Sequence, residues 1–277
     1  MKKSLLYATL FPFGLFAPVA CASKPVPNSQ AMAASMAQAE NQAPGQYRAE
    51  PKLDDTTVWQ PLFNGRDLAG WHTINGTQGH QANFHVEGGD LVGTNDPKCG
   101  LNTFLRTEQG YSDFLLTCEF RWDVGGNSGV QIRSHQRPWG MNAWDGRLWG
   151  YQVEMDEKAR AWTGGLQEEG GPPARGWLHP LGDAKDEKFA AARHAVKLSE
   201  WNRLTVRAVG PRIETWLNGV PCTDYTEKNV TPDTQAGFFA LQVHYGPPSQ
   251  IRWRNLKVLP LGPMAPANVP NKKDGKQ

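Results

Sequence analysis

Alternation of apolar and polar residues dominates the middle of the chain. From Phe114 to Trp122 an apolar residue returns at every second position, which places apolar side chains on one face of an extended strand. Residues 204–209 and 213–217 also have the pattern of strands, and they are followed by Asn218-Gly219, a dipeptide typical of tight hairpin turns. The pattern predicts antiparallel hairpins, and the number of such strands predicts an all-β protein with two sheets packed as a sandwich.

Three further segments, 128–133, 151–156 and 238–244, carry reactive side chains opposite their apolar face. Side chains on one face of a strand repeat about every 6.6 to 6.8 Å, so strands of one sheet would line a single concave face with these groups. The alternative explanation is that these residues are polar only because the outer face of an antiparallel sheet is exposed to solvent. The residue types favour a site, because exposed strands are usually rich in Thr, Lys and Ser, and we expect Arg133, Glu154 and His244 to share one cleft. The polar residues are Gln131, Arg133, Gln152, Glu154, Asp156, Gln242 and His244.

Tryptophans crowd the segments between these strands. Their flat rings with a polar edge suit the apolar face and the hydroxyls of a sugar, and packing of loops is the alternative that stays open. They are Trp139, Trp144, Trp149, Trp162 and Trp177.

The first 22 residues are typical of an export signal. Lys2 and Lys3 precede an apolar run over 5–19, which ends in Ala20-Cys21-Ala22. The run has about 15 residues, fewer than the roughly 20 that a membrane-spanning helix needs. We therefore expect an exported protein, periplasmic or secreted, and two routes stay open: cleavage after this triplet, or lipidation of Cys21.

Composition divides the rest into a tether, one domain and a tail. Residues 23–52 and 262–277 have few large apolar side chains and are expected to be flexible, which leaves one domain at 53–261. Without residues 1–22 the chain has 27 basic and 27 acidic residues, which argues against nucleic acid and favours a neutral substrate. Three cysteines then remain, so at most one disulfide can form, and buried thiols are the alternative.

Several segments, in order, resemble the 3-keto-disaccharide hydrolase family, formerly a domain of unknown function. The resemblance extends from about Leu53 to Leu261, and it implies a concanavalin A-like jelly-roll sandwich that cleaves glycosides oxidised at carbon 3. The matching segments are 59–71 (WQPLFNGRDLAGW), 125–133 (GGNSGVQIR), 150–156 (GYQVEMD), 237–244 (GFFALQVH) and 254–261 (RNLKVLPL).

The segment 160–177 is similar to the pocket loop of that family, in which an acidic pair precedes a second arginine. The chain departs from the pattern in a loop lengthened at 170–173, and in Gln152 followed by Glu154 where many members have Glu and then Gln. The polar strand faces and the resemblance together predict a substrate-binding set of Asn127, Gln131, Gln152, Arg160, Trp162, Glu168, Glu169, Arg175, Trp177 and Gln242.

The family chemistry begins with removal of the proton on carbon 2, which the carbonyl at carbon 3 makes acidic. The enolate then expels the group on carbon 1, and water adds back. We assign the base to Glu154 or His244 and enolate stabilisation to Arg133; the acid is Asp156, Glu168 or Glu169. A divalent metal on Glu154, Asp156 and His244 is an alternative electrophile that no ligand spacing requires.

No Gly-x-Gly-x-x-Gly turn is found, so no nucleotide cofactor is expected, and a separate sugar-oxidising dehydrogenase must supply a keto-sugar. Two other functions stay open. Glu154-Met155-Asp156 is similar to the Glu-x-Asp start of the signature of laminarinase-like retaining glycosidases. The third carboxylate of that signature would fall at residue 158 or 159, where this chain has Lys158 and Ala159. A non-catalytic lectin would need the aromatic and amide groups and not the charged ones.

Overall fold

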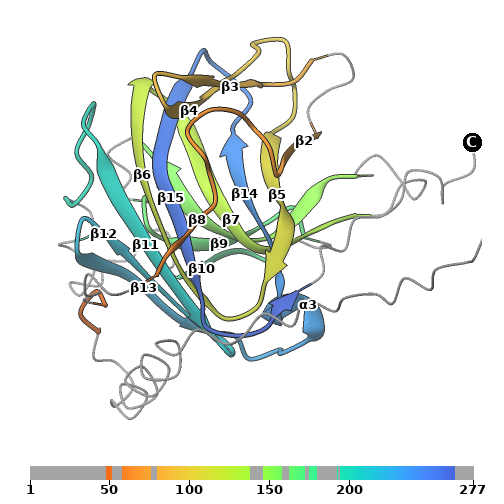
Figure 1. Cartoon of the computed structure of the whole chain (residues 1–277), viewed down its shortest axis with the longest axis vertical. Coiled ribbons are helices and arrows are strands. Elements are labelled where there is room, and N and C mark those ends of the chain that lie inside the picture. The colour runs from red at the N-terminus through yellow and green to blue at the C-terminus, as the bar shows by residue number, and fades with distance from the viewer. Residues whose placement is uncertain are drawn as a thin grey trace, which may run out of the picture. The chain divides into compact units, whose positions relative to one another are not determined.

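The computed structural model describes residues 48–51, 58–75, 80–137, 146–157, 162–171, 175–179, 192 and 194–265. These residues fold almost entirely into strands, arranged in two antiparallel sheets that face one another (Figure 1). The sequence-predicted all-β sandwich is therefore confirmed. The proposed export signal, Cys21 and most of the proposed tether lie outside the described residues, as do Trp139, Trp144 and Arg160.

The first sheet has the strand order β13-β12-β11-β6-β15-β4-β3, and β1 pairs with β15. Its strands are β1 (Gln60–Pro61), β3 (Asn83–Glu87), β4 (Asp90–Thr94), β6 (Phe114–Val124), β11 (Asn202–Val209), β12 (Arg212–Leu217), β13 (Val220–Thr226) and β15 (Gln250–Pro260).

The second sheet has the order β10-β9-β8-β7-β14-β5-β16, and β2 pairs with β5. Its strands are β2 (Trp71–Asn75), β5 (Thr103–Tyr111), β7 (Asn127–Gln136), β8 (Leu148–Asp156), β9 (Leu166–Glu169), β10 (Gly176–His179), β14 (Gly237–Val243) and β16 (Met264–Ala265). One short helix, α3 (Pro232–Gln235), precedes β14. No described helix has the length and apolarity needed to span a membrane.

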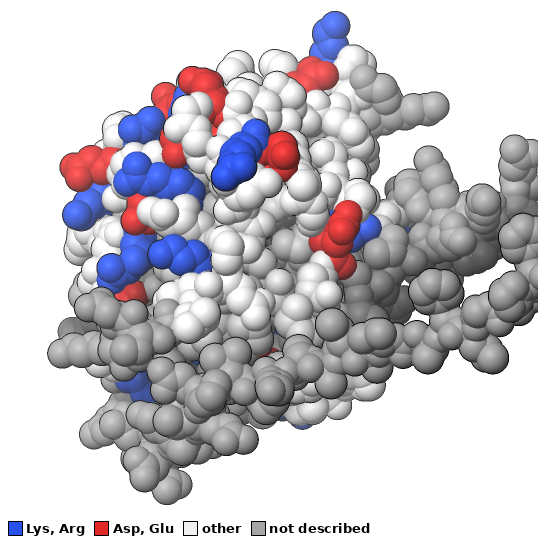
Figure 2. Space-filling model, viewed as in Figure 1, with Lys and Arg blue, Asp and Glu red and all other residues white. Residues whose placement is uncertain are grey.

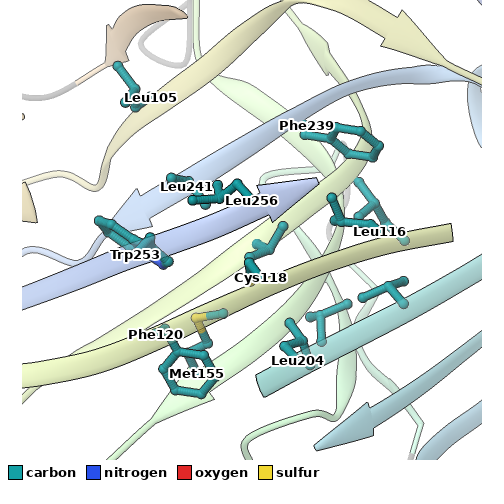
Figure 3. Close-up of a cluster of buried hydrophobic side chains, with 14 of the residues drawn as sticks. Leu105, Leu116, Cys118, Phe120, Met155, Leu204, Phe239, Leu241, Trp253 and Leu256 are labelled. Carbon is teal, nitrogen blue, oxygen red and sulfur yellow. The ribbon is translucent and has the colours of Figure 1, made fainter. Parts of the chain in front are cut away.

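The core lies between the two sheets, and the apolar positions of the alternating strands fill it (Figure 3). Leu116, Cys118 and Phe120 of β6 face Met155 of β8 and Leu241 of β14, all less than 4% exposed. Full burial of one such side chain stabilises the fold by about 1.5–3 kcal/mol. Since these positions point inward, the intervening residues of β7, β8 and β14 point to the outer face of the second sheet.

The predicted turn at Asn218-Gly219 joins β12 to β13. Both residues have positive φ angles, 53° and 89°, as a tight hairpin turn of the primed type requires. The asparagine side chain also accepts a hydrogen bond from the backbone N–H of Arg203 at 2.8 Å. The turn chemistry therefore fixes the register of this hairpin.

The outer face of the first sheet carries charges of both signs, which Figure 2 shows interspersed on the visible face. Arg252 pairs with Glu87 at 3.0 Å, and Arg254 pairs with Glu119 at 2.6 Å. Residues 48–51 also lie against this sheet, where Trp216 Nε1 donates to the carbonyl of Arg48 at 2.9 Å. On the described part of this face, charges of opposite sign thus neutralise one another.

The described cysteines, Cys99, Cys118 and Cys222, are buried and form no disulfide with one another. Burial raises the pKa of the Cys118 thiol, and that of Cys222, to about 12. These cysteines therefore act as small apolar side chains, the second of the two alternatives above.

Candidate functional site

The outer face of the second sheet carries a compact group of amide and carboxyl side chains. Strand pairing sets it in rows, because directly opposed residues project to the same side. Gln152 of β8 is opposite Gln131 of β7 and Gln167 of β9, and Glu154 is opposite Gly129. Glycine at residue 129 lets the side chain of Gln152 lie close to the backbone of β7, since a Cβ atom there would be 2.7 Å from Cδ of Gln152.

Glu154 is held at the centre of this group by three amides. Its side chain, in a residue only 2% exposed, accepts hydrogen bonds from Gln167 Nε2 at 2.7 Å and Gln152 Nε2 at 3.1 Å. Asn127 donates to its other oxygen. Gln152 Nε2 also contacts Gln242 Oε1 at 3.2 Å, which connects the carboxylate to β14. The network orients the carboxyl group with neutral donors.

Burial raises the pKa of Glu154 to about 7. The hydrogen bonds from Asn127 and Gln152 lower it, and the charges of Asp156 and Glu169 raise it further. No salt bridge within the described residues offsets the cost of burying this charge. A carboxyl group that titrates near neutral pH can take up and release a proton under ordinary conditions, as a general base or acid must.

A cleft of about 460 Å³ opens above Glu154. His244 lies on its wall, where Nδ1 approaches the carbonyl oxygen of Tyr245 at 2.5 Å. A carbonyl oxygen can only accept, so Nδ1 carries a proton and this bond leaves Nε2 unengaged. Trp162 adds an aromatic wall and packs edge-on against Trp177, with ring centroids 5.1 Å apart.

Seven of the sequence-predicted residues line this cleft, and the remaining described ones lie elsewhere. The seven are Asn127, Gln152, Glu154, Trp162, Glu169, Gln242 and His244. The carboxylate of Glu169 is bound by Asn102 Nδ2 at 3.0 Å and by Arg147 Nη2 at 3.1 Å.

Arg133 does not lie in the cleft, so the predicted convergence holds for Glu154 and His244 but not for this arginine. A β-bulge in β7 breaks the alternation: the register shifts between Ile132 and His135, and Arg133 has a φ of +48°. Its side chain reaches the carbonyls of Ser112 (3.0 Å), Gly210 (2.7 Å) and Thr234 (3.0 Å) and the carboxylate of Asp113 (3.1 Å). With every contact made inside the protein, Arg133 stabilises the fold.

Gln131 and Asp156 are buried and do not line the cleft. Gln131 is fully buried and accepts a hydrogen bond from Ser134 Oγ at 2.9 Å, while its Nε2 has no partner. Asp156 is buried at the end of β8 and acts on the cleft through its charge, which raises the pKa of Glu154.

Glu168 and Arg175 lie on the other side of β9 and contact each other. Glu168 is the register partner of Tyr151, whose ring belongs to the core between the sheets, so the acidic pair at 168–169 is divided between two faces. Arg175 also binds Glu227 at 2.8 Å. Trp177 reaches the cleft only through its contact with Trp162.

Sequence reasoning missed the other lining residues of the cleft, and Glu157, Gln167 and Tyr245 have the largest polar side chains among them. Gln167 directly follows the buried Leu166, so alternation places its side chain on the opposite, outer face of the sheet, which it shares with Gln152. This change from an apolar to a polar residue was the only local signal in so short a strand. Glu157 is the first residue after β8 and Tyr245 the second after β14, where alternation no longer predicts the direction of a side chain.

Within the described residues, no three His, Cys, Asp or Glu side chains approach closely enough to hold a metal ion. The geometry of Glu154, Asp156 and His244 therefore gives no support to the metal alternative.

Residues 58–259 match the model of the 3-keto-alpha-glucoside-1,2-lyase-like domain. The chain belongs to this family. The match confirms the resemblance that the sequence segments indicated, and it makes this a carbohydrate-related β-sandwich protein. No curated protein matches the chain significantly.

Solved structures agree with the fold. A Bacillus subtilis protein of unknown function with a galectin-like fold is 12% identical, with a TM-score of 0.50 over 77% of this chain and 97% of that one. A candidate glycosyl hydrolase of Parabacteroides distasonis is 21% identical (TM-score 0.47, 72% of this chain, 92% of that one). Carbohydrate-binding module CBM66 of B. subtilis is 18% identical (TM-score 0.43, 68% and 93%).

Proposed function

We propose that this protein cleaves 3-keto-glucosides, with Glu154 as the base that removes the proton from carbon 2. One observation carries the proposal: a buried carboxylate with a pKa of about 7 faces an open cleft and is oriented only by neutral amides. Membership of a 3-keto-alpha-glucoside-1,2-lyase-like family supports the substrate class.

The proposed reaction is an elimination, which breaks the bond between carbon 1 and the leaving oxygen, followed by the addition of water. Glu154 takes the proton on carbon 2, and the electron pair of that bond forms an enolate with the carbonyl at carbon 3. The enolate then reforms the carbonyl, makes a double bond between carbons 1 and 2, and expels the oxygen on carbon 1, which is protonated as it leaves. Addition of water to carbon 1 and return of a proton to carbon 2 complete a hydrolysis.

Gln242 replaces Arg133 as the proposed stabiliser of the enolate. Its Oε1 is occupied by Gln152, whereas its Nε2 makes no hydrogen bond with the described residues and belongs to a residue that lines the cleft. An amide N–H placed at a developing oxyanion lowers the barrier without neutralising the base. His244 is the proposed acid for the leaving oxygen: with Nδ1–H donated to the Tyr245 carbonyl, the imidazolium form would give up the proton on Nε2 and return to the neutral ring.

We also propose that the protein acts outside the cytoplasm and that a separate dehydrogenase oxidises the sugar beforehand. The sequence of residues 1–22, which has the pattern typical of an export signal, supports the first point. Mass spectrometry of the mature N-terminus, in the parent and in Cys21→Ser, separates the two routes: an unmodified terminus at Ser23 in the parent excludes lipidation.

The decisive experiment offers trehalose and its 3-keto form to the protein in heavy water. The proposal expects cleavage of the keto form only, with deuterium at carbon 2 of the released 3-keto-glucose. Free 3-keto-glucose incubated without protein controls for spontaneous exchange. Glu154→Gln should lower cleavage and exchange by about 10² to 10⁴, while Glu157→Gln, on the same cleft, retains most activity.

Two results would redirect the assignment. Cleavage of unoxidised glucosides without exchange at carbon 2 would favour a retaining glycosidase, which attacks carbon 1 directly. Binding of glucosides without any cleavage would favour a lectin, the alternative that Trp162 and the amides of the cleft also fit.

A further inference from the structure

A second cavity, of about 280 Å³, lies on the opposite side of β8 from Glu154. Trp149, Tyr151 and Glu168 form part of its wall. Tyr151 and its register partner Glu168 project toward the space between the sheets, whereas the next pair, Gln152 and Gln167, projects to the outer cleft. No residue lines both hollows, so the two are separate sites.

The arginines beside this cavity are already neutralised from within the protein. Arg175 contacts Glu168, donates to Glu227 at 2.8 and 3.2 Å, and lies 3.4 Å from the hydroxyl of Tyr225. Arg133 directs its guanidinium at three carbonyls and one carboxylate. An anionic ligand would find no unpaired cation here, and the exposed carboxylate of Asp233 would repel it. The charges therefore favour a neutral ligand.

An aromatic ring and two polar side chains line the cavity together. Trp149 is partly buried and packs on His135, with ring centroids 5.0 Å apart, and His135 Nε2 in turn binds the carbonyl of Asp233 at 2.9 Å. The side chains of Asn229 and Asp233 are exposed and make no hydrogen bond within the described residues. Their backbones are nevertheless fixed, by the bond from Asn229 N to Glu227 at 2.8 Å and by the capping box of α3.

This combination matches one chemical class. A pyranose ring has an apolar C–H face, which packs on an indole ring, and hydroxyls around its edge, which an amide and a carboxylate can bind. We propose that this hollow, the Trp149 pocket, binds one ring of a neutral pyranoside and is a second, non-catalytic carbohydrate site. A second site on one chain would hold a longer saccharide near the Glu154 cleft by raising its effective concentration.

The test follows the indole N–H signals of the tryptophans by NMR in the Glu154→Gln protein, in which no turnover consumes the ligand. Methyl α-glucoside, methyl α-mannoside and methyl β-galactoside are titrated into the millimolar range. The signal that disappears in Trp149→Phe identifies the Trp149 indole. It should shift saturably with at least one glycoside, and Asp233→Ala should weaken that binding about tenfold or more while the melting temperature stays unchanged.

Trp162→Ala is the matched control, because it removes an aromatic ring from the other cleft. Binding that survives Trp162→Ala and is weakened by Asp233→Ala supports the Trp149 pocket. The absence of a saturable shift, or binding lost in Trp162→Ala and retained in Asp233→Ala, would overturn it. Because the readout is binding in a protein without the proposed base, failure of the proposed catalysis would leave this result unaffected.

Discussion

Replacement of Gln167 by leucine tests how the amides set the basicity of Glu154. The amide donates to the carboxylate at 2.7 Å, and a hydrogen bond to the charged form lowers a pKa. A hydrogen bond to a charged group is worth about 1.5–3 kcal/mol, and 1.36 kcal/mol corresponds to one pKa unit. Gln167→Leu should therefore raise the pKa of Glu154 from about 7 by about one to two units.

The assay is kcat/KM for a 3-keto-glucoside as a function of pH. With a base that must be ionised, the acid limb of the profile should move upward by the same one to two units, so that activity lost at pH 7 is recovered at higher pH. Gln131→Leu is the control, because Gln131 is opposite Gln152 on the same face but does not contact Glu154. An acid limb that stays in place in Gln167→Leu, or moves equally in Gln131→Leu, would refute the reasoning.

Two predictions concern stability. Between pH about 4.5 and 7 the folded protein holds a proton on Glu154 that the unfolded chain releases, so rising pH costs stability there, by up to about 3 kcal/mol in total. Glu154→Gln lacks this titration, so its melting temperature should rise relative to that of the parent as the pH increases from 5 to 8. Melting temperatures that change equally with pH in the two proteins would contradict this prediction. Gly237→Ala should destabilise the fold by about 1–3 kcal/mol or more in urea unfolding, because its Cβ would lie 2.4 Å from the carbonyl carbon of Arg133. An unchanged midpoint would show that the bulge relaxes freely.

The fold was predictable because its strands follow period two over long stretches. In β6 the apolar positions from Phe114 to Trp122 are all buried in the core, as the alternation predicted. The turn at Asn218-Gly219 was equally readable, since few other dipeptides adopt two positive φ angles. The pairing of strands far apart in sequence, such as β6 with β15, has no local signal and required the structure.

The site was predictable only where the alternation is unbroken. Gln152 and Glu154 lie in a regular part of β8 and face the cleft as expected. Arg133 is two residues from Gln131 in β7, so unbroken alternation would place it on the cleft face. The bulge turns its side chain away from the cleft. Gly150 and Gly237 mark that bulge, because a Cβ on either would lie within 3 Å of the backbone at 133–134. Glycines in the two strands that flank β7 were thus the sequence signal that its alternation is interrupted near residue 133.

Two of the buried glutamates that the structure describes, Glu154 and Glu227, have neighbours that give them opposite chemistry. Burial raises the pKa of both, but at Glu227 the hydrogen bonds from Arg175 and from the hydroxyl of Tyr151 outweigh it and lower the pKa to about 2. At Glu154 the donors are neutral amides, so burial prevails and the pKa is about 7. Had Arg133 reached the cleft, its charge would have moved Glu154 toward the behaviour of Glu227 and removed its basicity at neutral pH. The bulge that turns the arginine away is therefore consistent with a base at Glu154, and an enolate formed in this cleft would have to be stabilised by dipoles such as the amide of Gln242 rather than by a neighbouring cation.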